Sequence, residues 1–327
     1  MMKVNRLSKL LGIAMLSAGL TVVSVSGAAA QQRMTIGTAS SGGVFFPLGT
    51  GMAEVLSQEV EGVSFSAEST GGSAENARLV GSGGTSMGLA MADVAYYARQ
   101  GLADFEDEGA YEDLRGVMMI YTQMMHLIVP ANSDIETMAD LEGRRVSPGP
   151  AGSGTSFMTD ILLDAYGLKD SVSLDLLTHD QQASALGDGR IDAAFMLFPP
   201  GGAAVEAYAN AHQARFIPID DPDITSTLQE EYPFYAPTPI PAGSYTGQDE
   251  AVPSIGVSVV LVAHKDLDED VIFDVTRVLN EHPERLAAYH SIAASMTTDN
   301  ALNGMPVELH AGAERYYREV NHPGLTQ

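Results

Sequence analysis

The sequence predicts an α/β fold of two lobes with a cleft between them. Short apolar strands alternate with helical segments along residues 34–100 and again along 145–197, which is typical of a parallel sheet covered by helices. A strongly apolar strand at 258–263 returns late in the chain and is suited to pair with one at 127–130. One lobe would then contain both ends of the mature chain, with the second inserted into it. Such a crossing leaves a cleft where small ligands usually bind.

The elements of the first lobe can be placed in order. A strand at 34–38 runs through a Gly/Ser turn into a helix at 44–60, whose apolar residues share one face and whose Pro47 suits a first helical turn. The pattern then repeats twice. The remaining elements are a strand at 63–67, a helix at 74–80, a strand at 87–91, a helix at 94–100, and the late helices at 271–280, 284–294 and 311–320.

The second lobe follows the same pattern. The sequence predicts strands at 145–147 and 191–197 and helices at 155–166 and 181–186. Residues 220–253 are rich in Pro, Tyr and Asp without a clear period, so we expect ordered irregular structure there. We assign residues 31–125 and 252–327 to lobe one and 126–251 to lobe two, with the hinge near 122–130 and 252–263.

Residues 1–30 have the features of a secretory signal. Three basic residues, Lys3, Arg6 and Lys9, precede an apolar run over 10–25 and a small-residue site that ends at Ala30. The alternative, a retained membrane anchor, would need about 20 strongly apolar residues, and this run contains Gly, Ser and Thr. We expect cleavage after Ala30 and a periplasmic location.

Charge and composition exclude several classes of protein. The chain has 42 acidic and 17 basic residues, a formal net charge of −25, so it should repel nucleic acid and anionic lipid. It contains no Cys, which excludes disulfides, thiol nucleophiles and thiolate metal ligands. P-loop and H-E-x-x-H motifs are also missing from the sequence. We therefore predict no catalytic residue, no metal site and no cofactor.

Three Gly/Ser/Thr turns stand at predicted strand-to-helix junctions, at 38–43, 70–76 and 149–156. The first N–H groups of a helix point outward at the positive end of its dipole, and glycine lets a ligand approach the backbone. Several such ends facing one cleft would hold a carboxylate or phosphate without Lys or Arg. Taken singly, each turn is also an ordinary helix cap. The repetition in both lobes favours a cleft for a small anion.

Seven segments, in order along the chain, resemble the TAXI-type solute receptors of TRAP transporters. They are IGTASSGGVFFPLG at 36–49, TGGSAENARL at 70–79, DVAY at 93–96, LEGRRVSPGPAGSGT at 141–155, DGRIDA at 188–193, IPAGSYTGQD at 240–249 and HAGAERYYRE at 310–319.

The resemblance implies a two-lobed periplasmic-binding-protein fold, type II-like, that delivers a small organic anion such as glutamate or 2-oxoglutarate to a membrane permease. Uptake in such systems is driven by an ion gradient. The expected binding residues are Ser40, Ser41, Gly42, Gly43, Phe45, Ser73, Asn76, Asp93, Ser153, Gly154, Thr155 and Ser156.

The chain departs from that family at two places. Met91-Ala92-Asp93 replaces a frequent Gln-Ser-Asp, and Phe45 and Phe46 stand where Tyr is common. Both changes make the cleft less polar, so a dicarboxylate or oxo-acid with a less polar tail is expected. Two alternatives stay open: a ligand-sensing module for a signalling partner, and a periplasmic serine hydrolase that uses Ser153.

Overall fold

The computed structural model describes residues 32–41, 43–232 and 234–325. The predicted signal segment, residues 1–30, lies outside the described residues. Within the described part, strands and helices alternate as predicted, and the strands join in one mixed sheet in the order β2-β1-β3-β10-β4-β7-β5-β6.

The first half of the sheet follows the predicted order closely. Parallel strands β1 (Gln32–Gly37), β2 (Val63–Glu68) and β3 (Met87–Met91) are each followed by a helix. These helices are α1 (Phe45–Glu59), α2 (Ser73–Gly81) and α3 (Ala92–Gln100). The carboxyl ends of the three strands therefore lead into three helix amino ends on the same side.

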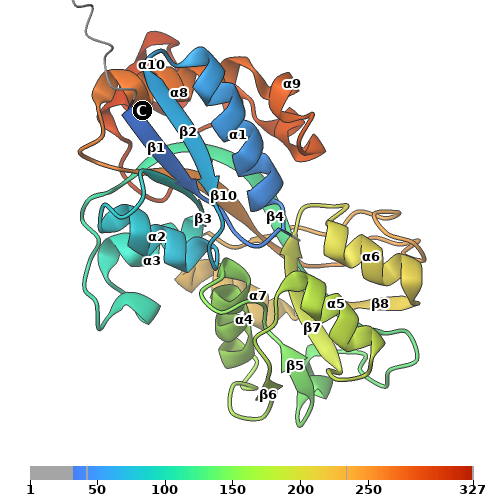
Figure 1. Cartoon of the computed structure of the whole chain (residues 1–327). Helices are drawn as coiled ribbons and strands as arrows, with labels where there is room; N and C mark the ends of the chain where they lie inside the picture. The colour runs from blue at the N-terminus through green and yellow to red at the C-terminus, as the bar shows by residue number, and fades with distance from the viewer. Residues whose placement is uncertain (1–31, 42, 233, 326–327) are drawn as a thin grey trace, which may run out of the picture. The chain divides into compact units, whose positions relative to one another are not determined.

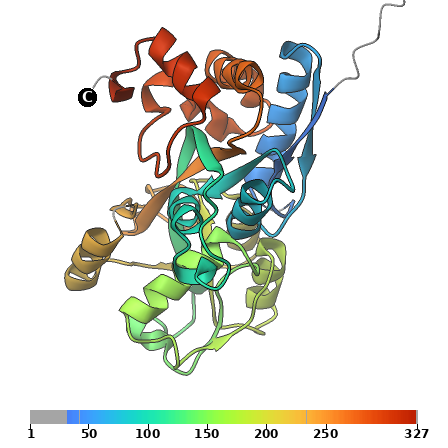
Figure 2. The ribbon, with the colours of Figure 1, turned by 90° about the vertical axis from the view of Figure 1, so that its left-hand side faces the viewer.

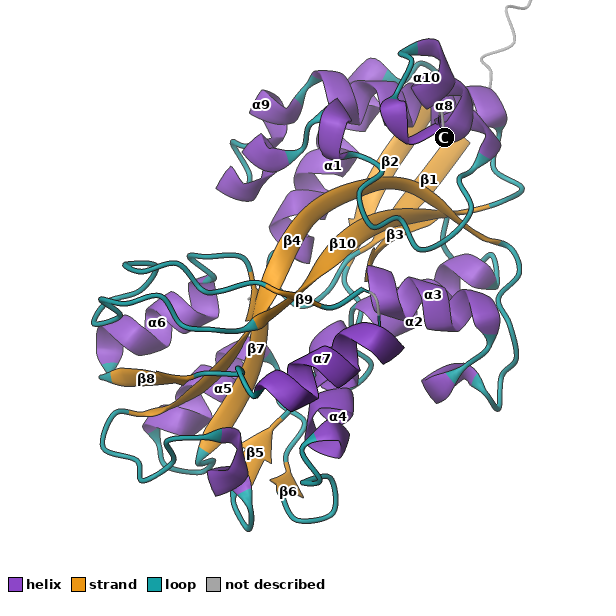
Figure 3. Cartoon of the chain, turned by 180° about the vertical axis from the view of Figure 1, so that it is seen from behind, coloured by secondary structure: helices purple, strands orange, loops and turns teal. Residues whose placement is uncertain are grey.

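Two long antiparallel strands, β4 (Leu114–Pro130) and β10 (Ile255–His264), connect the halves of the sheet. Figure 3 shows β4 running from the half that contains α1 to the half that contains β7 and β8. The predicted pairing of 127–130 with 258–263 is wrong in register. Residues 127–130 pair with β7 and β8, while β10 pairs with residues 114–124 of the same long strand.

The second half contains β5 (Arg145–Ser147), β6 (Ser173–Leu174), β7 (Ala193–Phe198) and β8 (Ala214–Ile217). Its helices are α4 (Gly154–Ala165), α5 (His179–Gly187) and α6 (Ala203–Ala211), grouped away from α1 in Figure 1. The lobe boundaries at 125 and 251 stay a prediction, and β4 continues through the first of them.

The segment predicted to be irregular begins with a helix, α7 (Pro222–Glu231), which corrects that expectation. Its start is well specified, because the Asp221 carboxylate accepts hydrogen bonds from the N–H groups of Asp223 and Ile224, and Pro222 occupies the first turn. The rest includes the short β9 (Ala236–Pro237) and buries Tyr235 and Tyr245.

The carboxyl-terminal helices return to the first half of the sheet. They are α8 (Glu269–Glu281), α9 (Pro283–Leu286) and α10 (Ala311–Glu319), and they lie on the side of α1 in Figure 2. The helix predicted over 284–294 is too long: α9 ends at Leu286, and a separate 3₁₀ turn follows at η3 (Ser291–Ser295). Other 3₁₀ turns are η1 (Ala103–Phe105), η2 (Met138–Leu141), η4 (Thr298–Asn300) and η5 (Pro323–Leu325).

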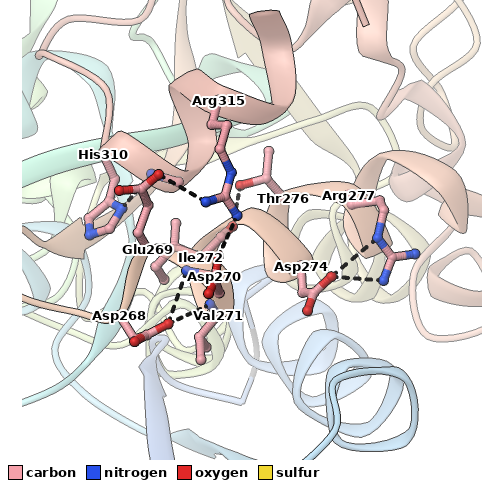
Figure 4. A network of polar contacts seen from close by, with 11 residues as sticks. Asp268, Glu269, Asp270, Val271, Ile272, Asp274, Thr276, Arg277, His310 and Arg315 are labelled. Atoms are coloured by element: carbon pink, nitrogen blue, oxygen red, sulfur yellow. Dashed lines mark hydrogen bonds and ion pairs between the residues drawn. The ribbon is translucent and has the colours of Figure 1, made fainter. Parts of the chain in front are cut away.

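A polar network fixes α10 on the start of α8 (Figure 4). The Arg315 guanidinium contacts Glu269 at 3.0 Å and Asp270 at 2.8 Å. Gly312 allows the close approach, since a Cβ at that position would collide with the Glu269 carbonyl oxygen. None of the helices in the described ranges is long and apolar enough to cross a membrane.

Candidate functional site

A pocket of about 430 Å³, part of it open to solvent, lies where the two halves of the sheet meet. It is lined by segments from both halves: the β1–α1 turn, the start of α2, the loop before α4, the start of α5, and strands β4 and β7. The lining residues are Ala39, Ser40, Gly43, Val44, Phe45, Gly71, Gly72, Ser73, Met91, Tyr121, Gln123, Pro150, Ser153, Gly154, Thr155, His179, Leu197 and Phe198.

Four helices begin at this pocket. The first residues of α1, α2, α4 and α5, which are Phe45, Ser73, Gly154 and His179, all line it. The first backbone N–H groups of a helix have no partner within the helix, and the dipole gives that end a partial positive charge. Four helix ends therefore direct positive potential toward one volume.

The amino ends of α2 and α4 have backbone N–H groups without a hydrogen-bond partner. Within the described residues, the N–H groups of Ser73, Gly154 and Thr155 donate to no acceptor. The Ser153 hydroxyl caps α4, because it accepts from Ser156 N–H at 3.1 Å and donates to the Pro150 carbonyl at 2.7 Å. Its one donor hydrogen goes to a backbone carbonyl and neither bond joins it to a base, so the geometry gives no support to a Ser153 nucleophile.

The two halves of the sheet touch beside the pocket. Ala74 of α2 donates its N–H to the carbonyl of Gly152 at 3.0 Å, which links the α2 start to the loop before α4. Gly154 packs against Met91 and Ser73: a Cβ there would collide with the Met91 sulfur and lie 2.9 Å from Ser73 Oγ. Glycine at this position allows the two halves to approach as closely as they do.

The side chains that line the pocket carry no formal charge at neutral pH. The described lining contains no Lys, Arg, Asp or Glu, and its one titratable imidazole is that of His179. Burial lowers the pKa of His179 below its usual value. An anion in this pocket would be held by backbone and side-chain dipoles instead of an ion pair.

The tautomer of His179 follows from its neighbours. The Gln182 amide nitrogen donates to the carbonyls of Ser147 and Phe195, at 3.1 and 2.9 Å, which fixes its oxygen as an acceptor. That oxygen lies 2.9 Å from His179 Nδ1, so Nδ1 carries the hydrogen and Nε2 is an unprotonated acceptor. The ring also packs on Phe198, with centroids 4.7 Å apart.

The structure distributes the sequence-predicted binding residues over three places. Ser40, Gly43, Phe45, Ser73, Ser153, Gly154 and Thr155 line the pocket. Ser41 and Ser156 are not part of its lining, and Gly42 lies outside the described residues.

Asn76 and Asp93 lie away from the lining and are committed to internal bonds. The Asn76 amide donates to the carbonyls of Thr38 and Leu89 at 2.7 and 2.8 Å and accepts from the Thr70 hydroxyl. The Asp93 carboxylate accepts from the Tyr235 hydroxyl and from Val94 N–H.

Eleven lining residues are missing from the predicted binding set, and four of them, Ala39, Gly71, Gly72 and Pro150, lie within the predicted turns. Leu197 and Phe198 end an apolar strand, and the sequence around His179 contains no recognisable ligand motif. Tyr121 and Gln123 had a detectable signal, because two polar side chains at i and i+2 interrupt a Met-rich apolar strand and share a face of it.

Solved structures with the same fold include two proteins from Xanthomonas. The alkanesulfonate-binding protein SsuA from Xanthomonas axonopodis pv. citri, bound to MOPS, is 15% identical with a TM-score of 0.50, and the match covers 88% of this chain and 83% of that one. XAC2383 from Xanthomonas citri, bound to ATP, is 10% identical with a TM-score of 0.50 and coverage of 88% and 95%. At such identities the likeness shows the fold, which is the expected two-lobed periplasmic-binding-protein fold.

The model of the NMT1-like family matches residues 36–320, a range that includes every lining residue of the pocket. The chain therefore belongs to the NMT1-like family.

Proposed function

We propose that this chain is an extracytoplasmic solute-binding protein that captures a small organic anion and delivers it to a membrane permease. The observation that carries the proposal is the convergence of four helix amino ends, from both halves of the sheet, on one uncharged pocket. Helix amino ends with free N–H groups are ready anion sites.

The net charge of −25 does not oppose an anionic ligand. Acidic side chains are missing from the described lining, and exposed charges are screened by salt beyond about 8–10 Å. Inside the pocket, the apolar walls lower the local dielectric, and a dipole interacts more strongly with an anion at low dielectric. The nearby N–H groups therefore outweigh the distant carboxylates.

The walls of the pocket indicate an anion with a less polar part. Val44, Phe45, Met91 and Phe198 present apolar surface beside the N–H groups. A dicarboxylate or oxo-acid fits such a mixture, and 2-oxoglutarate and glutamate are the first compounds to test. The resemblance of residues 36–49 and 141–155 to TAXI-type receptors supports a TRAP-type permease as the partner and a periplasmic location.

Two charge insertions at helix starts test the proposal. Thr155→Asp adds a carboxylate at the start of α4 inside the pocket, and Ala203→Asp adds one at the exposed start of α6, outside the lining. Both acids suit a helix amino end, so both variants should fold. Ligand is identified by mass spectrometry of protein purified without denaturation, and affinities are measured by isothermal titration.

We expect Thr155→Asp to weaken anion binding at least about tenfold, because a like charge replaces the attraction of the helix end. Ala203→Asp should bind like the wild type. A solute that is a cation, or an anion that Thr155→Asp binds as tightly as the wild type does, would contradict the proposal.

A further inference from the structure

The Tyr121 hydroxyl is a buried polar group without a partner in the part of the chain that the structure describes. Its side chain is 1% exposed and lines the pocket from strand β4. Buried hydroxyls in proteins are nearly always hydrogen-bonded, because leaving the bond unmade costs free energy. An unpartnered hydroxyl that borders a ligand pocket therefore points to a bond that is completed by the ligand.

A β-bulge sets the position of Tyr121. Val259 of β10 stands opposite Tyr121, but the next residue, Val260, stands opposite Met119, so Ile120 is an extra residue in β4. Ile120 and Tyr121 consequently belong to the same core cluster although they are consecutive in a strand. Bulges often occur beside functional sites, where they re-aim a side chain.

Gln123 is the second polar residue of this strand at the pocket. It is buried and lines the same pocket, and its amide has no hydrogen bond to any described residue. The amide nitrogen of Gln123 carries two donor hydrogens, so it can donate to a carboxylate or oxo oxygen of a ligand. Two polar side chains at i and i+2, one of which ends in the unpartnered Tyr121 hydroxyl, thus line the pocket together with Met91, Leu197 and Phe198.

The Tyr121 hydroxyl acts as a donor toward the ligand. Burial raises its pKa well above the usual range, so it stays protonated at any physiological pH. An apolar tail would leave both this donor and the Gln123 amide unpaired. A site with buried polar groups rejects analogues that lack the matching atom more strongly than an apolar pocket rejects an extra methylene.

We propose that Tyr121 and Gln123 select the solute, with Tyr121 donating to a second oxygen of an anion whose first carboxylate is held by the helix amino ends. The inference rests on the proposed function and narrows its substrate class. The preferred ligands carry two oxygen functions, as dicarboxylates and oxo-acids do, and monocarboxylates with a hydrocarbon tail are rejected.

Three five-carbon acids test the selection: valerate, glutarate and 2-oxoglutarate. They are titrated into the wild type, Tyr121→Phe and a control, Tyr317→Phe. Tyr317 is also fully buried, but its hydroxyl donates to the Val117 carbonyl at 3.2 Å, and it does not line the pocket. We expect the wild type to prefer glutarate or 2-oxoglutarate to valerate. In Tyr121→Phe, the ratio of the affinities for these acids and for valerate should be about tenfold smaller, and in Tyr317→Phe it should be unchanged.

Thermal unfolding without ligand gives a second readout. Tyr121→Phe removes an unpaired buried hydroxyl, so its Tm should equal or exceed that of the wild type, whereas Tyr317→Phe breaks a made bond and should lower Tm. A merely structural Tyr121 would lose stability and leave the preference unchanged.

The outcomes separate the inference from the proposed function. If an oxygen-rich acid binds and Tyr121→Phe keeps the wild-type preference, the selection by Tyr121 is wrong while anion binding stands. If the wild type binds valerate best, the selection is also wrong. If no anion binds the wild type, the proposed function fails, and this inference fails with it.

Discussion

The Tyr235 hydroxyl donates a hydrogen bond to Asp93 Oδ2 over 2.5 Å, and both side chains are buried away from solvent. The bond joins the start of α3 to the segment after α7, which is 142 residues further along the chain. Asp93 Oδ1 accepts from Val94 N–H at 2.7 Å. Burial still dominates and raises the pKa of Asp93 to about 6, although these bonds oppose the rise.

Replacement of Asp93 should change how stability depends on pH. The pKa of Asp93 is higher in the folded protein, about 6, than its ordinary value of 3.8, so the folded state binds the proton more tightly. Its contribution to stability is therefore greatest below pH 3.8 and is lost as pH rises to about 6. Over that window, Asp93→Asn should gain on the order of 3 kcal/mol relative to the wild type. Urea unfolding at pH 4.0, 5.0, 6.0 and 7.5 measures it.

The comparison with the wild type is necessary because other carboxyl groups act in the opposite direction. Arg145 lowers the pKa of Asp192, and Tyr111 and Arg78 lower that of Glu108. The stabilisation that such groups contribute is lost as pH falls, and it is lost equally in the wild type and in Asp93→Asn. If the difference in unfolding free energy between Asp93→Asn and the wild type does not change from pH 4 to 7.5, folding does not raise the pKa of Asp93, and the prediction is wrong.

The contact between Gly154 and Met91 predicts that a larger residue at position 154 prevents the two lobes from closing fully over the ligand. In Gly154→Ala, the added methyl group collides with the Met91 sulfur, so the α4 start should stand further from β3. We expect a loss of ligand affinity of about tenfold or more and a larger radius of gyration at ligand saturation, by small-angle scattering. Gly84→Ala is the control, because its Cβ has no neighbour closer than 3.4 Å.

A compensating change makes this prediction specific. Met91→Ala with Gly154→Ala removes the colliding sulfur and should recover part of the affinity and the compact radius. If the single variant binds normally, or if the double variant is weaker still, the contact does not control closure.

The sequence predicted the alternating strands and helices and three of the four helix starts at the pocket, because these depend on local signals. Periodic apolar residues mark α1, and Gly/Ser turns mark the starts of α2 and α4. The start of α7 was missed, although the Asp221-Pro222 pair was readable, because tyrosines and prolines obscured its period.

Residues that depend on pairing between distant strands were not predictable in this way. Tyr121 lines the pocket because of a bulge, and a bulge is visible only once β10 is paired with β4. Asp93 looked like a ligand residue, yet a tyrosine far along the chain takes its carboxylate. Local sequence specifies the helix starts, and tertiary contacts decide which polar side chains remain free.

The neutral imidazole of His179 predicts that anion binding strengthens as pH falls. Burial lowers its pKa in the free protein, although Asp180 and the Gln182 hydrogen bond oppose the shift. A bound anion in the same pocket favours the charged imidazolium and raises that pKa, so binding takes up a proton. Affinity should then rise as pH falls through the raised pKa, by up to about tenfold per pH unit. Titrations from pH 5.5 to 8, in buffers of different ionisation enthalpy, measure both affinity and proton uptake.

His179→Gln should abolish the pH dependence, whereas His212→Gln, at an exposed position outside the pocket, should retain it. The same pH dependence in His179→Gln as in the wild type would show that the coupled proton binds elsewhere.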